Sequence, residues 1–123
     1  MKPTFLNTGV DMTREEYFEF HENCCKKMVA VTKAKNHDYS SGATNPFSNF
    51  TQVEHLGIAS TEQGFLTRMT DKLARIITFV NKGVLKVSDE SVEDTLIDLA
   101  NYCILFAGYI RSKRNITEPV LHD

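Results

Sequence analysis

The sequence contains no tryptophan, only three prolines and only three cysteines in 123 residues. Two of the cysteines, Cys24 and Cys25, are adjacent, and the third is Cys103. An odd number with an adjacent pair argues against a disulfide framework and favours a reducing compartment, so we expect a cytoplasmic protein. Because no Cys-x-x-Cys or paired Cys/His spacing occurs, the common structural zinc sites are excluded as well.

Long apolar runs and an excess of basic residues are also missing. No apolar stretch reaches about 18 residues, and the N-terminus lacks the basic and apolar segments of a signal peptide. The formal net charge is −2, whereas general binders of nucleic acids or membrane surfaces have a basic excess. We therefore expect no membrane partner and no direct nucleic-acid partner. Glycine-rich phosphate loops, nucleophile elbows and His-Glu-x-x-His motifs do not occur either.

What is present is helical periodicity. Thr13-Arg-Glu-Glu16 forms a capping box that predicts a first helix over residues 14–35. Residues 36–45 have the composition of a loop, and Asn45-Pro46 predicts the start of a short helix that Gly57 ends.

Two further long helices are predicted after Gly57. The third begins at Ser60 or Thr61 and ends at Gly83. After a short extended link over 84–87, the last begins at Ser88 or Asp89 and reaches about Arg114. No segment predicts a strand. The expected fold is an all-α helical bundle of three long helices and one short helix, with an arm over 1–12, one domain over 13–115 and a tail over 116–123.

The last helix is unusual because residues 102–106 (Tyr-Cys-Ile-Leu-Phe) are apolar on every side. A helix of this kind is surrounded by protein, either by the other helices or by a second subunit. We therefore expect dimerisation to complete the bundle, as a homodimer or a higher homo-oligomer.

An acidic stripe lies on the same helix. Glu90, Asp94, Asp98 and Asn101 occur at i, i+4, i+8 and i+11, on one helical face. Carboxylates are the hard oxygen ligands that Mg²⁺ prefers, so Glu90, Asp94 and Asp98 are candidate metal ligands, with Asn101 orienting a ligand. A solvated acidic face is the alternative.

A basic stripe lies on the third helix, where Arg68, Asp71, Lys72 and Arg75 occur at i, i+3, i+4 and i+7. Three interpretations stay open. The stripe binds phosphate, because arginine matches phosphate oxygens in a bidentate manner and lysine adds a point charge. Alternatively, it is a surface face with an Asp71–Arg75 ion pair. In the third interpretation it neutralises the acidic stripe across the bundle.

The segment Lys35-Asn-His-Asp-Tyr39, followed by Asn45-Pro-Phe47, places polar groups beside aromatic rings. Such a mixture suits a nucleobase, which needs stacking and a few hydrogen bonds to its edge. Lys35, Asp38, Tyr39 and Phe47 are therefore candidates for contacts with a base or sugar. A loop held by Asx-turns is the alternative.

Together these motifs carry a resemblance to a known family. Lys35…Asp38-Tyr39, Arg68-x-x-Asp-Lys72-x-x-Arg75 and Asp89-Glu90-Ser-x-x-Asp94-Thr-x-x-Asp98-Leu-x-Asn-Tyr102 resemble the nucleotide modification associated domain of phages and bacteria, over roughly residues 33–112. That domain looks like a relative of the MazG-like all-α nucleoside triphosphate pyrophosphohydrolases. Asp98 matches the final Asp of their metal-binding pattern, and Asp94 lies one turn before it.

The sequence also departs from the MazG-like pattern. Asp71 and Arg75 stand where those enzymes have two glutamates, and Thr95 stands where they have another. The resemblance nevertheless implies a Mg²⁺-dependent, phage-encoded nucleoside triphosphate pyrophosphohydrolase that acts on a (deoxy)nucleotide. Asp71 and Asp98 would be catalytic, with Arg68, Lys72 and Arg75 neutralising phosphate charge. The alternatives are a nucleotide-binding sponge without turnover and a helical interaction module.

Overall fold

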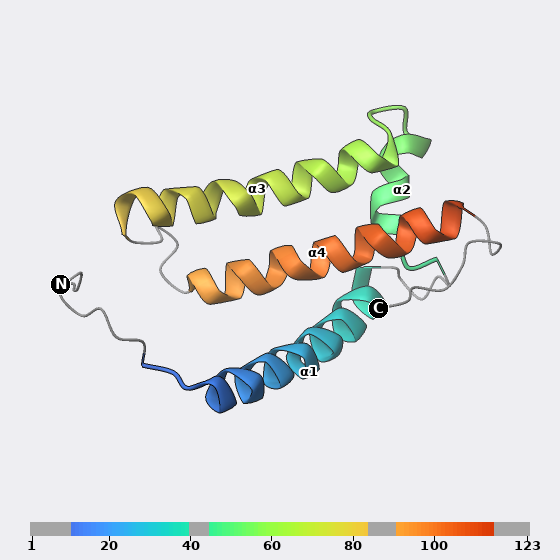
Figure 1. The fold of residues 1–123 in the computed structure, drawn as a ribbon. Coiled ribbons are helices and arrows are strands. Elements are labelled where there is room, and N and C mark those ends of the chain that lie inside the picture. Colours follow the sequence, from blue (N-terminus) through green and yellow to red (C-terminus); the bar gives the residue numbers. More distant parts are fainter. Residues whose placement is uncertain (1–10, 40–44, 84–90, 115–123) are drawn as a thin grey trace.

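The computed structural model describes residues 11–39, 45–83 and 91–114, and these form four helices. They are α1 (Arg14–Tyr39), α2 (Ser48–His55), α3 (Thr61–Lys82) and α4 (Val92–Lys113), as Figure 1 shows. No strand occurs in the described ranges, which confirms the all-α class. Most of the predicted arm, the predicted tail and the 84–87 link lie outside them. None of the helices described is both long and apolar enough to cross a membrane.

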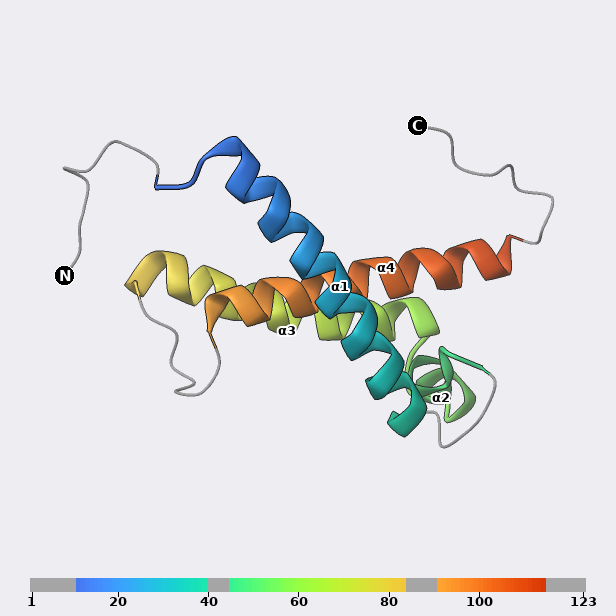
Figure 2. The same ribbon diagram turned by 90° about the horizontal axis from the view of Figure 1, so that it is seen from below.

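The helices are arranged in layers around α4. Helices α3 and α4 run antiparallel side by side, and α2 packs at one end of this pair (Figure 1). Helix α1 crosses α4 obliquely, on the side away from α3 (Figure 2). The N-terminal half of α1 therefore diverges from the other helices.

Several predicted helix ends are confirmed. The Thr13 hydroxyl accepts from the Glu16 amide at 3.1 Å, and the Glu16 carboxylate accepts from the Thr13 amide at 2.9 Å. Ser60 and Gln63 form the same reciprocal pair at the start of α3. Gly57 and Gly83 adopt φ values of 75° and 79°, which a side chain would disfavour.

Other boundaries differ from the prediction. Helix α1 continues through Tyr39, and in its last turns the Asn36 side-chain amide donates to the Pro46 carbonyl, just before α2, at 2.9 Å. Helix α2 begins at Ser48 rather than at Asn45-Pro46, because the Asn45 side chain accepts from the Phe47 amide in a turn. Helix α4 begins at Val92 with Ser91 as its N-cap, whereas the expected caps at 88 and 89 lie outside the described residues.

The core is a stack of aromatic rings from three helices. The Phe65 ring of α3 is fully buried between Phe50 of α2, at 4.0 Å between centroids, and Phe106 of α4, at 4.6 Å. Tyr102 meets Phe50 edge-on, and Tyr109 lies against Phe65. The stack therefore fixes α2, α3 and α4 to one another.

A hydrogen-bonded carboxylate joins α2 to the start of α3. Glu54 accepts from the amide of Thr61 at 2.9 Å and from its hydroxyl at 2.8 Å. Thr61 is almost fully buried, so Glu54 satisfies an amide that the helix itself cannot. These two hydrogen bonds lower the pKa of Glu54 below its usual value of 4.5.

We predict that Phe65→Ala lowers the free energy of unfolding by about 3–5 kcal/mol, because it leaves a cavity at the centre of the ring stack. Urea denaturation followed by circular dichroism measures this change. Phe18→Ala is the matched control, since Phe18 is 56% exposed on α1 and its loss should cost far less. Equal costs for the two variants would contradict the proposed role of the stack.

The lowered pKa of Glu54 predicts a pH dependence. A carboxylate whose pKa is depressed by folding stabilises the protein above its unfolded pKa, and this stabilisation is lost as the pH falls through the folded pKa. The melting temperature should therefore drop below about pH 4.5, and Glu54→Gln should be less sensitive over that range. Glu19→Gln, an exposed acid of α1, is the control. Parallel curves for wild type and Glu54→Gln would refute the assignment.

Candidate functional site

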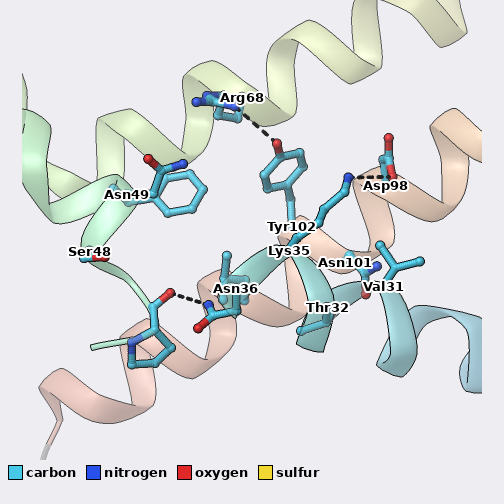
Figure 3. Close-up of a pocket in the computed structure, with 13 residues that line it drawn as sticks. Val31, Thr32, Lys35, Asn36, Ser48, Asn49, Arg68, Asp98, Asn101 and Tyr102 are labelled. Atoms are coloured by element: carbon cyan, nitrogen blue, oxygen red, sulfur yellow. Dashed lines mark hydrogen bonds and ion pairs between the residues drawn. The ribbon is translucent and has the colours of Figure 1, made fainter. Parts of the chain in front are cut away.

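A hollow of about 360 Å³ lies where the four helices meet (Figure 3). Such a volume is within the usual range of small-ligand sites. Every helix contributes to its wall, which is formed by Val31, Thr32, Lys35, Asn36, Pro46, Ser48, Asn49, Phe50, Arg68, Asp98, Asn101, Tyr102 and Leu105.

The wall combines apolar surface with side-chain amides. Val31 and Leu105 supply aliphatic surface. Asn36, Asn49 and Asn101 each carry a carbonyl acceptor and an NH₂ donor pair. A flat heterocycle with donors and acceptors on its edge would find both kinds of contact here.

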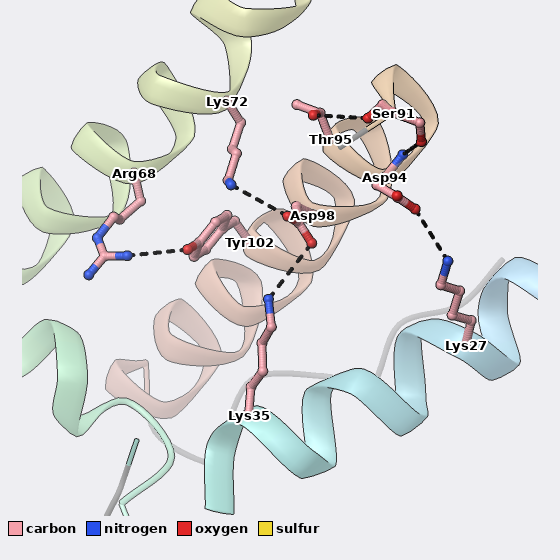
Figure 4. Close-up of polar contacts among 9 residues, drawn as sticks. All are labelled: Lys27, Lys35, Arg68, Lys72, Ser91, Asp94, Thr95, Asp98 and Tyr102. Carbon is pink, nitrogen blue, oxygen red and sulfur yellow. Dashed lines mark hydrogen bonds and ion pairs between the residues drawn. The ribbon is translucent and has the colours of Figure 1, made fainter. Parts of the chain in front are cut away.

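Asp98 is the electrostatic centre of the site. Its carboxylate receives Lys72 of α3 at 3.4 Å and Lys35 of α1 at 3.9 Å (Figure 4). The Asp98 side chain is 26% exposed and that of Lys72 is 15% exposed, so this junction is only partly screened by water. Asp98 therefore connects three helices through charge.

Arg68, which like Lys72 belongs to α3, is the third cation of the site. Its guanidinium donates to the Tyr102 hydroxyl at 3.4 Å, across the pocket wall. A guanidinium carries five N–H donors, and this contact uses one of them. Lys35 and Lys72 pair with Asp98, and Arg68 adds a further positive charge to the wall, so the site has a positive balance.

Asp94 lies one turn before Asp98 but belongs to a separate contact. Its carboxylate receives Lys27 of α1 at 3.3 Å, and it does not line the pocket. The hydrogen bond from Lys27, followed by that from Ser91, lowers the pKa of Asp94. The lowered pKa keeps the Asp94 carboxylate ionised at neutral pH. Its side chain is 47% exposed to solvent.

The structure thus brings together only part of the predicted site. Lys35, Arg68, Asp98 and Asn101 line the pocket, and Lys72 reaches it through Asp98. The contact between Lys72 and Asp98 is the one expected if the two stripes neutralise each other.

The remaining predicted residues lie elsewhere. Asp71 and Arg75 pair with each other at 3.5 Å, outside the pocket wall, as expected for a surface pair. Phe47 packs edge-on against Tyr109 and lies against the core cluster, so it belongs to the core rather than to the wall. Glu90, and the side chains of Asp38 and Tyr39, lie outside what the structure describes.

Several wall residues were not singled out from the sequence. Tyr102 and Leu105 follow Asp98 at i+4 and i+7, so the helical period could have placed them on its face. Asn36 and Thr32 could have been found in the same way, as neighbours of Lys35. Ser48, Asn49 and Phe50 carry no such signal, because their position depends on how α2 packs.

The carboxylates of α4 can be compared with the ligands that a Mg²⁺ site requires. Among the residues described, no group of three or more His, Cys, Asp or Glu side chains converges. Magnesium commonly takes only one or two carboxylates and completes its shell with water and substrate phosphates. Asp98 meets this need as a carboxylate of the pocket wall, whereas Asp94 lies outside the wall and pairs with Lys27.

Comparison with known proteins gives one match. The family model described as nucleotide modification associated domain 1 matches residues 35–107. This span begins at Lys35 and includes Arg68, Lys72, Asp98 and Asn101. No curated protein and no solved structure matches the chain significantly.

Proposed function

The chain belongs to the nucleotide modification associated domain 1 family, and we propose that it binds a phosphorylated nucleoside in the pocket between its four helices. The observation that carries this proposal is that three cations lie at the hollow: Lys35 and Arg68 line it, and Lys72 pairs with Asp98 of its wall. Apolar and amide-bearing side chains complete the wall, so it offers partners for the base or sugar as well as for the phosphate.

The cations would bind the phosphate end. Lys35 and Lys72 now share the carboxylate of Asp98, and phosphate oxygens would replace that carboxylate as their partner. The Arg68 guanidinium could add a bidentate contact, which a lysine cannot make. Without a ligand, Asp98 keeps the cations in place and limits their mutual repulsion.

The amide-bearing wall would bind the base or sugar. Asn49 of α2 and Asn101 of α4 face the hollow from different helices, as Figure 3 shows. Their amides can pair with acceptors and donors of a base edge, while Val31 and Leu105 cover its faces.

We predict that Lys72→Met lowers the affinity for a nucleotide about ten- to hundredfold, because a charge-assisted hydrogen bond contributes about 1.5–3 kcal/mol. Calorimetric titration with individual nucleoside mono-, di- and triphosphates measures this loss. Lys113→Met is the matched control, because Lys113 pairs with Glu62 away from the pocket. Equal affinities of the two variants, or no binding by wild type across the set, would overturn the proposal.

A second candidate is the Mg²⁺-dependent pyrophosphohydrolase activity expected from the MazG-like resemblance, in a phage-encoded protein. The observation in its favour is that Asp94 and Asp98 lie one turn apart on α4, and that Asp98 pairs with two of the cations proposed for phosphate. These two carboxylates would hold the ion, which would supply an activated water and polarise a phosphoryl oxygen. Arg68 and Lys72 would neutralise charge that develops on the phosphates.

Asp98→Asn separates turnover from simple binding. For a hydrolase, we predict that it abolishes the Mg²⁺-dependent release of pyrophosphate from a nucleoside triphosphate. For a binding protein, it should strengthen metal-free nucleotide binding, because the lysines lose a competing anion. Pyrophosphate detection and calorimetry provide the two readouts, with Glu93→Gln, an exposed acid of α4, as control.

A third result would point elsewhere. If Asp98→Asn lowers the melting temperature and wild type binds no nucleotide, the ion pairs are structural and the helical interaction module is favoured. The proposal also includes a cytoplasmic location, which agrees with three free cysteines, and a homodimeric state.

A further inference from the structure

Helix α3 carries an exposed apolar stripe on its flank away from the pocket. Residues 66, 70, 73, 77 and 80 (Leu, Thr, Leu, Ile and Val) follow alternating steps of four and three. The four aliphatic members are 53%, 48%, 50% and 72% exposed in chain order. This spacing is the one by which helices pack in coiled coils and four-helix bundles.

Helix α4 repeats the same spacing with smaller side chains. Residues 96, 100, 103, 107 and 110 are Leu, Ala, Cys, Ala and Ile. Leu96 is 48% exposed and Ile110 is 37% exposed, and the residues at 103 and 107 are exposed as well. None of the ten positions in the two stripes carries a charge.

The two stripes lie on one side of the α3–α4 pair. With about 100° per residue, Leu73 and Ile77 project from the flank of α3 opposite to Arg68 and Arg75. On α4, Leu96 and Cys103 likewise project away from Asp98 and Asn101. Because the helices run antiparallel, the two polar flanks meet at the pocket and the two apolar flanks share the other side. We call this second side the outer face.

We propose that the outer face binds the outer face of a second copy of this chain, so that two α3–α4 pairs form a four-helix bundle. The inference names the surface of the proposed homodimer and rests on that part of the proposed function. A two-fold axis would bring the large side chains of α3 against the small side chains of α4 in the other copy. The face is thus complementary to itself, as a symmetric dimer requires.

The size of the face supports this occupant. Helix α3 has 22 residues, so it is about 33 Å long at 1.5 Å per residue. Two adjacent helices, each about 10 Å wide, give a face of about 660 Å². A standard interface buries about 800 Å² per partner, so the outer face supplies most of the area that one requires.

Ile77→Glu tests the surface, because it places a charge within the α3 stripe at a side chain that is already half exposed. We expect light scattering to give a molar mass of twice 14.0 kDa for wild type, the mass of a dimer, and of 14.0 kDa for the variant. Leu96→Glu should have the same effect from α4. Circular dichroism should show unchanged helicity in both, since neither side chain is in the core.

Phe18→Glu is the matched control, because Phe18 is equally exposed but lies on α1. This variant should remain a dimer. A monomeric wild type, or dimers that persist in both Ile77→Glu and Leu96→Glu, would overturn the proposal. A dimer broken by Phe18→Glu alone would do so too, because it would assign the contact to α1.

Nucleotide titration of the Ile77→Glu monomer keeps the two proposals apart. The pocket lies on the other side of the α3–α4 pair, so a monomer should bind with unchanged affinity if wild type binds. If wild type is a dimer but binds no nucleotide, the proposal of nucleotide binding is contradicted and the proposal of the dimer interface is retained.

Discussion

The fold depends on the Phe65 ring, which is stacked between Phe50 and Phe106. This contact joins three helices that have few other buried side chains: among the described residues, the buried hydrophobic set is Phe50, Phe65 and Tyr109. Because α1 contributes no ring to the stack, it stays apart from the core and a hollow remains beneath it. Phe50 belongs to both, since it packs on Phe65 and lines the pocket. Core packing and pocket shape are therefore set by the same side chain.

Two ion pairs connect α1 to α4. Lys27 and Lys35, about two turns apart on α1, pair with Asp94 and Asp98, which lie one turn apart on α4. A phosphorylated ligand would compete with Asp98 for Lys35 and for Lys72 of α3. Binding would then exchange a contact within the protein for a contact through the ligand, at the junction where three helices meet. Salt screens the contacts of these groups within the protein and with a charged ligand alike, so stability and affinity at this site are physically linked.

Helices α3 and α4 each present different chemistry on their two flanks. Cations and carboxylates face the pocket, whereas aliphatic side chains in steps of four and three face outward. This division explains why the last helix is apolar around residues 102–106: Tyr102 and Phe106 pack in the ring cluster, while Cys103 and Ile104 are exposed in a single chain. Of the apolar residues 102–106 that predicted a second subunit, Cys103 belongs to the outer face proposed for the dimer.

The sequence by itself determined the helices and the position of several ends, because capping residues such as Ser60 and left-handed glycines such as Gly83 act locally. It also determined which charges share a helical face. Only the tertiary structure decided which of them meet. Lys72 reaches Asp98 while Arg75 turns back to Asp71, although both cations belong to one stripe. Phe47 enters the core while Phe50 also borders the pocket. The physical reason is that periodicity specifies a direction around one helix axis, whereas contacts between helices depend on their crossing and register, which the ring stack sets.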